Sequence, residues 1–273
     1  MIKNISKLVR YDLKRVIEKK NIIIFLILIA TYFIIKSPYK YIGDINMFDI
    51  VCLIQMEDML PVLIISILSV YLSSVVFIDR DLDQFVKIRI GNKRKWFTSK
   101  ILSIILINIL LFLSISLISL ILGIVVGNFK FGWGDGILSR VHAYPYAGFY
   151  SHFKLIIINM ITFVLFMSSI CILIGIICVK TNKSVIGMGC GFFYMVASPA
   201  LSFMASTKLI NSFIFTNYIV FNRRNFMNTE AEMIFLTTRE SVIYPLILLT
   251  LVLIVSIYVI KFVDFKGGDK KYE

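Results

Sequence analysis

The sequence predicts an all-α, polytopic membrane protein that forms a single transmembrane domain over residues 1–273, with six transmembrane helices. Hydrophobic residues make up 59% of the chain and charged residues only 16%, against about 25% charged residues in a soluble domain. The mean hydropathy is +0.88. The apolar residues gather in runs of about 20, the length that crosses some 30 Å of hydrocarbon. The bilayer must therefore be the solvent for much of the chain.

Six apolar runs without an interior acidic residue, histidine or arginine have about this length. They extend over residues 21–38, 59–78, 101–126, 155–179, 184–205 and 243–262. The first has a short uninterrupted core, Ile22 to Ile35, of the kind that a signal peptide also carries. A charged stretch of 20 residues precedes this core, and no small-residue cleavage site follows it, so we expect a retained first span.

The distribution of basic residues predicts the orientation. Of the 29 Lys and Arg residues, 20 fall in the N-terminal segment, residues 79–100, residues 180–183 and the C-terminal tail, whereas nine fall in the three alternate loops. Because basic loops stay in the cytoplasm, both termini are expected there. The net charge of +13 is thereby explained by topology, and no nucleic-acid partner is needed.

The first 20 residues precede the first span and predict an amphipathic helix at the cytoplasmic interface. Basic residues form a stripe on one face, and apolar residues recur at helical spacing on another: Ile2, Ile5, Leu8, Val9, Leu13, Val16 and Ile17. The alternative is a disordered basic tail that serves only topology.

The loop between the second and third spans predicts a short cytoplasmic helix. Acidic residues crowd its start, an apolar face recurs at helical spacing over residues 82–89, and Gly91 supplies a stop. Lys93–Lys95 then begin the third span at the headgroups, with Trp96 as an interfacial anchor. The apolar face either packs against the protein's own helices or docks into a soluble partner.

Signals of catalysis are weak. No phosphate-binding G-x-x-x-x-G-K-[ST] loop is present, so ATP would have to be bound by a partner. His142 and His152 lie in an external loop beside Asp135, where they form either a metal or acid–base cluster or, as we favour, a structural contact. The spacing matches no metal motif, and neither an enzyme activity nor a metal site is predicted.

Small and polar residues within the spans predict helix packing. Gly123 with Gly127, and Gly187 with Gly191, form small-xxx-small pairs. Pro199 is expected to kink or break the fifth span. Asn159 and Asn108 serve either interhelical hydrogen bonding, which we favour, or substrate contact. The cysteines are expected to be small buried residues: Cys52, Cys171, Cys178 and Cys190.

This arrangement resembles the ABC-2 family, the membrane subunits of type-2 ABC exporters. The likeness rests on the N-terminal amphipathic helix, the six spans with both ends inside, and the acidic, helical, turn and basic pattern of residues 79–100. It implies a bacterial cell membrane, separate ABC ATPase subunits that bind ATP and Mg²⁺, and a second membrane subunit. It also implies that the cytoplasmic helix is a coupling helix touching the ATPase, with contacts from Asp81, Leu82, Phe85, Val86, Arg89 and Ile90.

The resemblance further implies a substrate cavity lined by the second and fifth spans. The residues expected there carry no charge and suit an apolar or amphipathic cargo: Tyr71, Asn108, Phe192, Phe193, Tyr194 and Met195. An antimicrobial peptide or hydrophobic drug, moved outward, is the expected substrate. The external loop of residues 206–242 resembles one that folds partly back into the membrane, whereas the aromatic loop of residues 129–153 is longer than the family needs. The rival interpretation is a membrane sensor or immunity protein that binds a peptide through its external loops.

Overall fold

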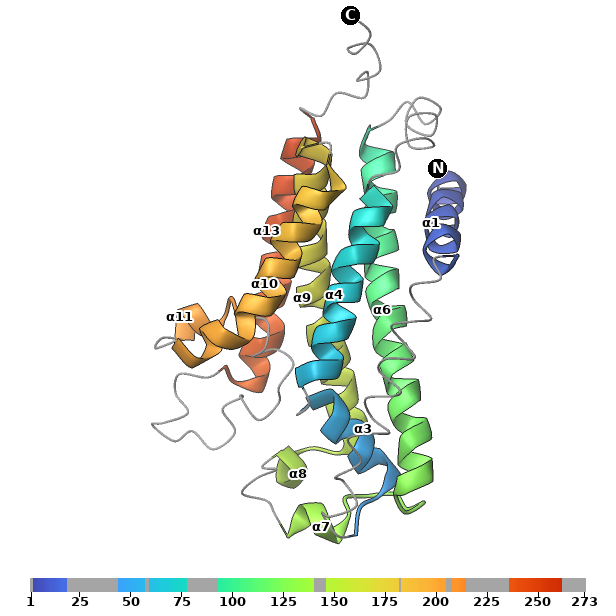
Figure 1. Ribbon diagram of the computed structural model, residues 1–273, viewed down its shortest axis with the longest axis vertical. Coiled ribbons are helices and arrows are strands. Elements are labelled where there is room, and N and C mark those ends of the chain that lie inside the picture. Colours follow the sequence, from blue (N-terminus) through green and yellow to red (C-terminus); the bar gives the residue numbers. More distant parts are fainter. Residues whose placement is uncertain are drawn as a thin grey trace, which may run out of the picture.

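The computed structural model shows a bundle of long helices with a layer of short helices at one end (Figure 1). The structure describes residues 2–18, 44–56, 59–77, 93–139, 146–181, 183–204, 208–214 and 236–261. Regular structure in these residues is helical, apart from an isolated bridge between Asn46 and Asn128. An all-α chain, as predicted, is therefore confirmed for the described residues.

Three helices are long and apolar enough to cross a membrane: α6 (Lys93–Val126), α9 (His152–Thr181) and α13 (Thr238–Ile260). They coincide with the third, fourth and sixth predicted spans. Each begins before the apolar run does, because backbone hydrogen bonding continues a helix beyond the hydrocarbon, and the 34 residues of α6 extend about 50 Å. The chain is accordingly a membrane-embedded protein.

Two further apolar helices occupy the second and fifth predicted spans. They are α4 (Met59–Phe77) and α10 (Ser184–Met204), whose apolar segments of 10–17 residues, Leu63–Phe77 and Ser184–Ser198, are shorter than those of the three long helices. The first predicted span, residues 21–38, lies outside the described residues, as does most of the loop of residues 206–242.

Helix α9 is the centre of the bundle. It contacts α3, α4, α6, α10 and α13. Of its apolar window 67% is buried, compared with 28% for α6 and 22% for α13. The outer helices therefore expose most of their apolar surface, which suits a lipid surrounding.

Glycines allow the helices around α9 to pack closely. A Cβ atom at Gly191 would lie 2.4 Å from Ile174 Cδ1, and one at Gly187 would lie 2.2 Å from Cys178 Sγ. The predicted packing role of this glycine pair is confirmed. The predicted break at Pro199 is wrong, because α10 continues through this position to Met204. A bundle in a membrane tolerates the loss of one helical hydrogen bond to proline.

The two ends of the bundle differ in structure (Figure 1). At one end, here called the α1 end, α1 (Ile2–Ile17) lies beside the last turns of α4 and the first turns of α6. At the other, the α3 end, the bundle carries α3 (Met47–Met56), α7 (Asp135–Leu138) and α8 (Tyr146–Phe149).

Helix α3 falls in a segment that the sequence predicted to be an external loop, and this prediction is wrong. The helix packs against α6 and α9 and buries Leu53 and Ile54 completely or nearly so. Close backbone approach makes this possible, since a Cβ atom at Gly123 of α6 would lie 2.4 Å from the carbonyl oxygen of Met47. The small residue in α6 thus seats the start of α3 against the bundle.

Candidate functional site

The α1 end is the candidate functional site, because residues 78–92, which include every predicted coupling residue, connect the two helix ends located there. Helix α1 has the predicted bounds, and its moment confirms that it is amphipathic. Val9 and Val16 are buried against the bundle, whereas Ile17, expected on the same face, is 68% exposed. The buried face is therefore rotated slightly from the expected one.

The rotation brings an acidic side chain inward. Asp12 is 2% exposed, and its Oδ1 accepts a hydrogen bond of 2.8 Å from Nζ of Lys100 on α6. Its Oδ2 accepts a 3.0 Å hydrogen bond from Ser103, one turn further along α6. Breaking such a buried ion pair by removing one partner costs about 3–5 kcal/mol, because an uncompensated charge stays in the interior. This pair is the strongest polar connection between α1 and the bundle.

A second connection joins α1 to α4. Nη2 of Arg15 donates a hydrogen bond of 2.5 Å to the carbonyl oxygen of Val75, two residues before the end of α4. Since Asp12 holds the beginning of α6, α1 is bonded to both helices that flank residues 78–92.

Aromatic rings pack the same two helix ends together. Phe77, the last residue of α4, packs edge-on to Trp96 of α6 with ring centroids 6.3 Å apart, and lies 5.9 Å from Phe97. The ring of Phe77 also rests on Gly175 of α9, where any Cβ atom would lie 2.0 Å from it. Trp96 is fully buried among protein groups, so its predicted role as an anchor in the membrane interface is wrong.

The coupling residues themselves, Asp81, Leu82, Phe85, Val86, Arg89 and Ile90, lie outside the described residues. The structure nevertheless defines where their segment starts and ends. Phe77 and Lys93 belong to helix ends that contact each other, α1 and α9. A displacement of the segment would therefore act on a packed junction of four helices.

The interior polar residues of the bundle bond to one another. Asn108 accepts a hydrogen bond from Ser69 of α4 and donates one of 3.1 Å to Ser168 of α9. Asn159 of α9 donates a 3.2 Å hydrogen bond to the backbone oxygen of Gln55 in α3. The interhelical bonds predicted for the two asparagines are therefore present.

The residues predicted to line a substrate cavity have three different surroundings. Asn108 and Met195 are completely buried. Tyr71 and Tyr194 are half-buried against the core, and the Tyr194 hydroxyl donates a 2.5 Å hydrogen bond to the carbonyl oxygen of Phe213. Phe192 and Phe193 are 52% and 74% exposed on the outer side of α10. Within this single chain, the six side chains do not share one cavity.

The α3 end contains a second buried carboxylate. Asp49 is completely buried, and its Oδ1 lies 2.6 Å from Nε2 of His152, which is the first residue of α9 and not part of a loop. Its Oδ2 accepts hydrogen bonds from the backbone N–H groups of Asn46 and Gly134, at 2.8 and 2.9 Å. The Trp133 ring covers the imidazole, with centroids 3.9 Å apart.

These contacts favour the structural interpretation of His152. No group of three or more His, Cys, Asp or Glu residues that could hold a metal is present among the described residues, which exclude His142. Burial, and secondarily the charge of Asp49, raises the pKa of the nearby Cys52 thiol well above its usual range. Cys52 is thus a neutral buried thiol, as are Cys171 and Cys178 by burial, whereas Cys190 is exposed on α10. All four cysteines are free.

Sequence reasoning missed Asp12, Lys100 and Asp49 as partners. A signal existed for Asp12, since it lies between Val9 and Val16 on the apolar side of a helix. Lys100 stands one residue before the predicted third span, where it was counted only as a topology charge. Asp49 gave no signal, because its helix was not predicted.

Comparison with models of protein families, with curated proteins and with solved structures finds no match to this chain.

Proposed function

We propose that the chain is the membrane permease subunit of an ATP-driven exporter of the ABC-2 type, working with separate ATPase subunits and a second membrane subunit in a bacterial cell membrane. The supporting observation is the junction at the α1 end. Residues 78–92, which carry the coupling pattern, begin and end on two apolar helices that pack against each other and that α1 binds through Asp12 and Arg15. Such a segment has a mechanical connection to the bundle.

Coupling in this proposal is mechanical. Closure of the ATPases pushes the segment of residues 78–92, and the push reaches α4 through Phe77 and α6 through Lys93. Because packed helices move as units between a few arrangements, the push tilts α4 and α6 against α9 and changes access to a cavity between the two membrane subunits. The exposed Phe192 and Phe193 are suited to such an interface, where they meet an apolar or amphipathic substrate.

The decisive experiment replaces Phe85 by Asp in the chain expressed with its ATPase. If Phe85 docks in an ATPase groove, the substitution buries an unpaired charge there and weakens the complex by orders of magnitude. Phe129→Asp is the matched control, because Phe129 is 73% exposed at the opposite end of the bundle. We expect F85D to lose ATPase co-purification and substrate-stimulated hydrolysis together, while F129D keeps both. Normal ATPase binding by F85D would contradict the proposal.

The proposal also includes six spans with the α1 end in the cytoplasm. Basic side chains support this orientation, since Lys7, Arg94, Lys180 and Lys183 all belong to helix ends there. Single cysteines at Ser139 and Asn225 should react with an impermeant thiol reagent from outside the cell. Cysteines at Asn92 and Lys270 should react only after permeabilisation, and labelling of Asn92 in intact cells would overturn the topology.

A sensor or immunity protein is the second candidate, and one observation favours it. The α3 end is folded as a unit, with its own small core that includes Leu53, Ile137 and Tyr146 and that Trp133 packs against. An ordered external cap is what a peptide receptor needs. The chain expressed without any ATPase would then still protect cells from its peptide, whereas an exporter subunit alone would not.

A further inference from the structure

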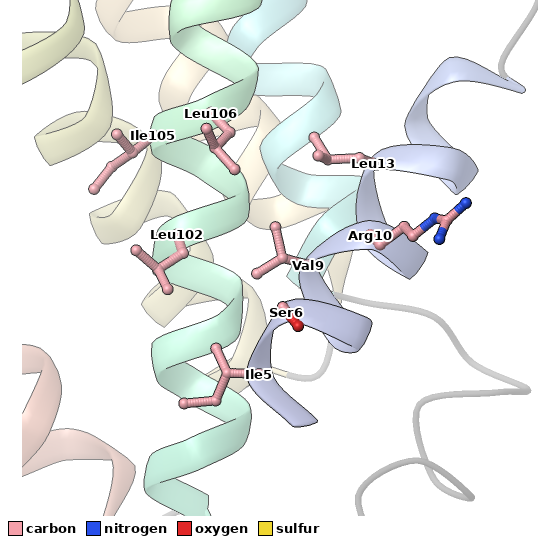
Figure 2. Close-up of a pocket in the computed structure, with 8 residues that line it drawn as sticks. All are labelled: Ile5, Ser6, Val9, Arg10, Leu13, Leu102, Ile105 and Leu106. Carbon is pink, nitrogen blue, oxygen red and sulfur yellow. The ribbon is translucent and has the colours of Figure 1, made fainter. Parts of the chain in front are cut away.

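A groove of about 600 Å³ opens between α1 and α6 (Figure 2). Its walls are aliphatic except for Ser6 and Arg10 of α1, and its lining residues are Ile5, Ser6, Val9, Arg10, Leu13, Leu102, Ile105 and Leu106. Figure 2 shows Val9 and Leu13 projecting from α1 toward α6, whereas the Arg10 guanidinium points away from α6 at the rim. The groove therefore has an apolar floor and a cationic edge.

The groove lies where α6 would enter the hydrocarbon. Lys93–Lys95 begin α6, and at 1.5 Å per residue Leu102 and Leu106 lie roughly 10 and 16 Å further along the helix than Lys95. Both leucines are exposed in the structure, at 41% and 38%. An amphiphile with its polar group at the level of the lysines would thus place its apolar chain along these leucines.

The rim has an excess of positive charge. Helix α1 carries five basic residues and one acidic residue, Asp12, whose charge is already balanced by Lys100 inside the protein. Lys14 contacts Glu18 at 3.8 Å, while Lys7 and Arg10 are exposed on the outer side of α1. The exposed surface beside the groove therefore favours an anion.

We propose that this groove binds an anionic phospholipid, with an acyl chain against Leu102 and Leu106 and the phosphate at Arg10 and Lys7. A zwitterionic lipid offers the same chain but no net charge for the rim, so it binds more weakly. The lipid covers the apolar space between α1 and α6 and holds α1 on the bundle beside the Asp12–Lys100 pair. The site does not depend on whether the chain is an exporter subunit or a sensor.

Native mass spectrometry of the full chain in detergent tests the proposal, with phosphatidylglycerol and phosphatidylcholine added at equal concentration. We expect preferential retention of one phosphatidylglycerol. Arg10→Glu should lower that retention at least fivefold, since each basic residue near a membrane surface contributes about that factor. Leu106→Trp, which fills the groove, should lower retention of both lipids.

Two control variants change the same residue types elsewhere. Lys183→Glu reverses an exposed charge at the α1 end but away from the groove, and Leu251→Trp enlarges a leucine on α13 that is 55% exposed. Both should retain phosphatidylglycerol like the unmodified chain. Equal retention of the two lipids by the unmodified chain, or equal loss in R10E and K183E, would overturn the proposal. So would a L106W variant that loses self-association and keeps its lipid, because the occupant would then be a second copy.

Discussion

The two ends of the bundle each bury a carboxylate, but they satisfy it in different ways. At the α1 end, Asp12 depends on two side chains of one helix, Lys100 and Ser103. At the α3 end, Asp49 accepts two backbone N–H groups in addition to the ring of His152. Backbone donors are fixed by the fold, whereas a side-chain pair can separate when its two helices move.

This difference assigns different mechanical properties to the two ends. The Asp49 cluster joins α3, the α7 segment and α9 into one cap, and its bonds persist as long as these backbones stay packed. The Asp12 pair is the kind of contact that can report or resist movement of α1 against α6. We therefore expect the α1 end to be the movable end, which is where the proposed coupling segment is attached.

The largest expected effect comes from Lys100→Met. The change leaves the Asp12 carboxylate buried with Ser103 as its remaining printed-sequence partner on α6, and should lower the free energy of unfolding by about 3–5 kcal/mol. Denaturant titration of the purified chain in micelles measures it. Adding Asp12→Asn to the same chain removes the buried charge and should restore most of the loss. A double variant no more stable than K100M would show that the charge is not the cause.

A smaller loss is expected for His152→Leu at the α3 end. Asp49 keeps the amides of Asn46 and Gly134, so only one hydrogen bond to a charged group disappears, which costs about 1.5–3 kcal/mol. The same titration should rank H152L as more stable than K100M. The reverse order would remove the distinction between backbone-held and side-chain-held carboxylates.

The smallest effect is expected for Lys14→Ala on α1. Lys14 and Glu18 form an ion pair of 3.8 Å whose side chains are 78% and 65% exposed. Exposed pairs contribute little because water and salt screen them, so stability should stay within measurement error. A clear loss in K14A would mean that the surface of α1, and not its buried pair, determines how this helix is held.

Hydropathy and periodicity alone determined where the apolar helices run and that an amphipathic helix precedes them. Helix α1 has its predicted bounds, and α6, α9 and α13 contain three of the predicted spans. These features were predictable because each depends on residues a few positions apart, through the 3.6-residue period or the thickness of the bilayer. The glycine pairs were readable for the same reason.

The tertiary structure alone decided the contacts that give the two ends their character. Asp12 and Lys100 are 88 residues apart in the chain, and Asp49 and His152 are 103 apart. No local period connects such pairs, and a charge beside a membrane span reads as a topology signal whether it faces water or a partner. Trp96 illustrates the same limit, since an aromatic ring next to three basic residues suits the interface equally well until Phe77 is packed against it. Burial depends on which helices become neighbours, and this is set by packing across the whole bundle.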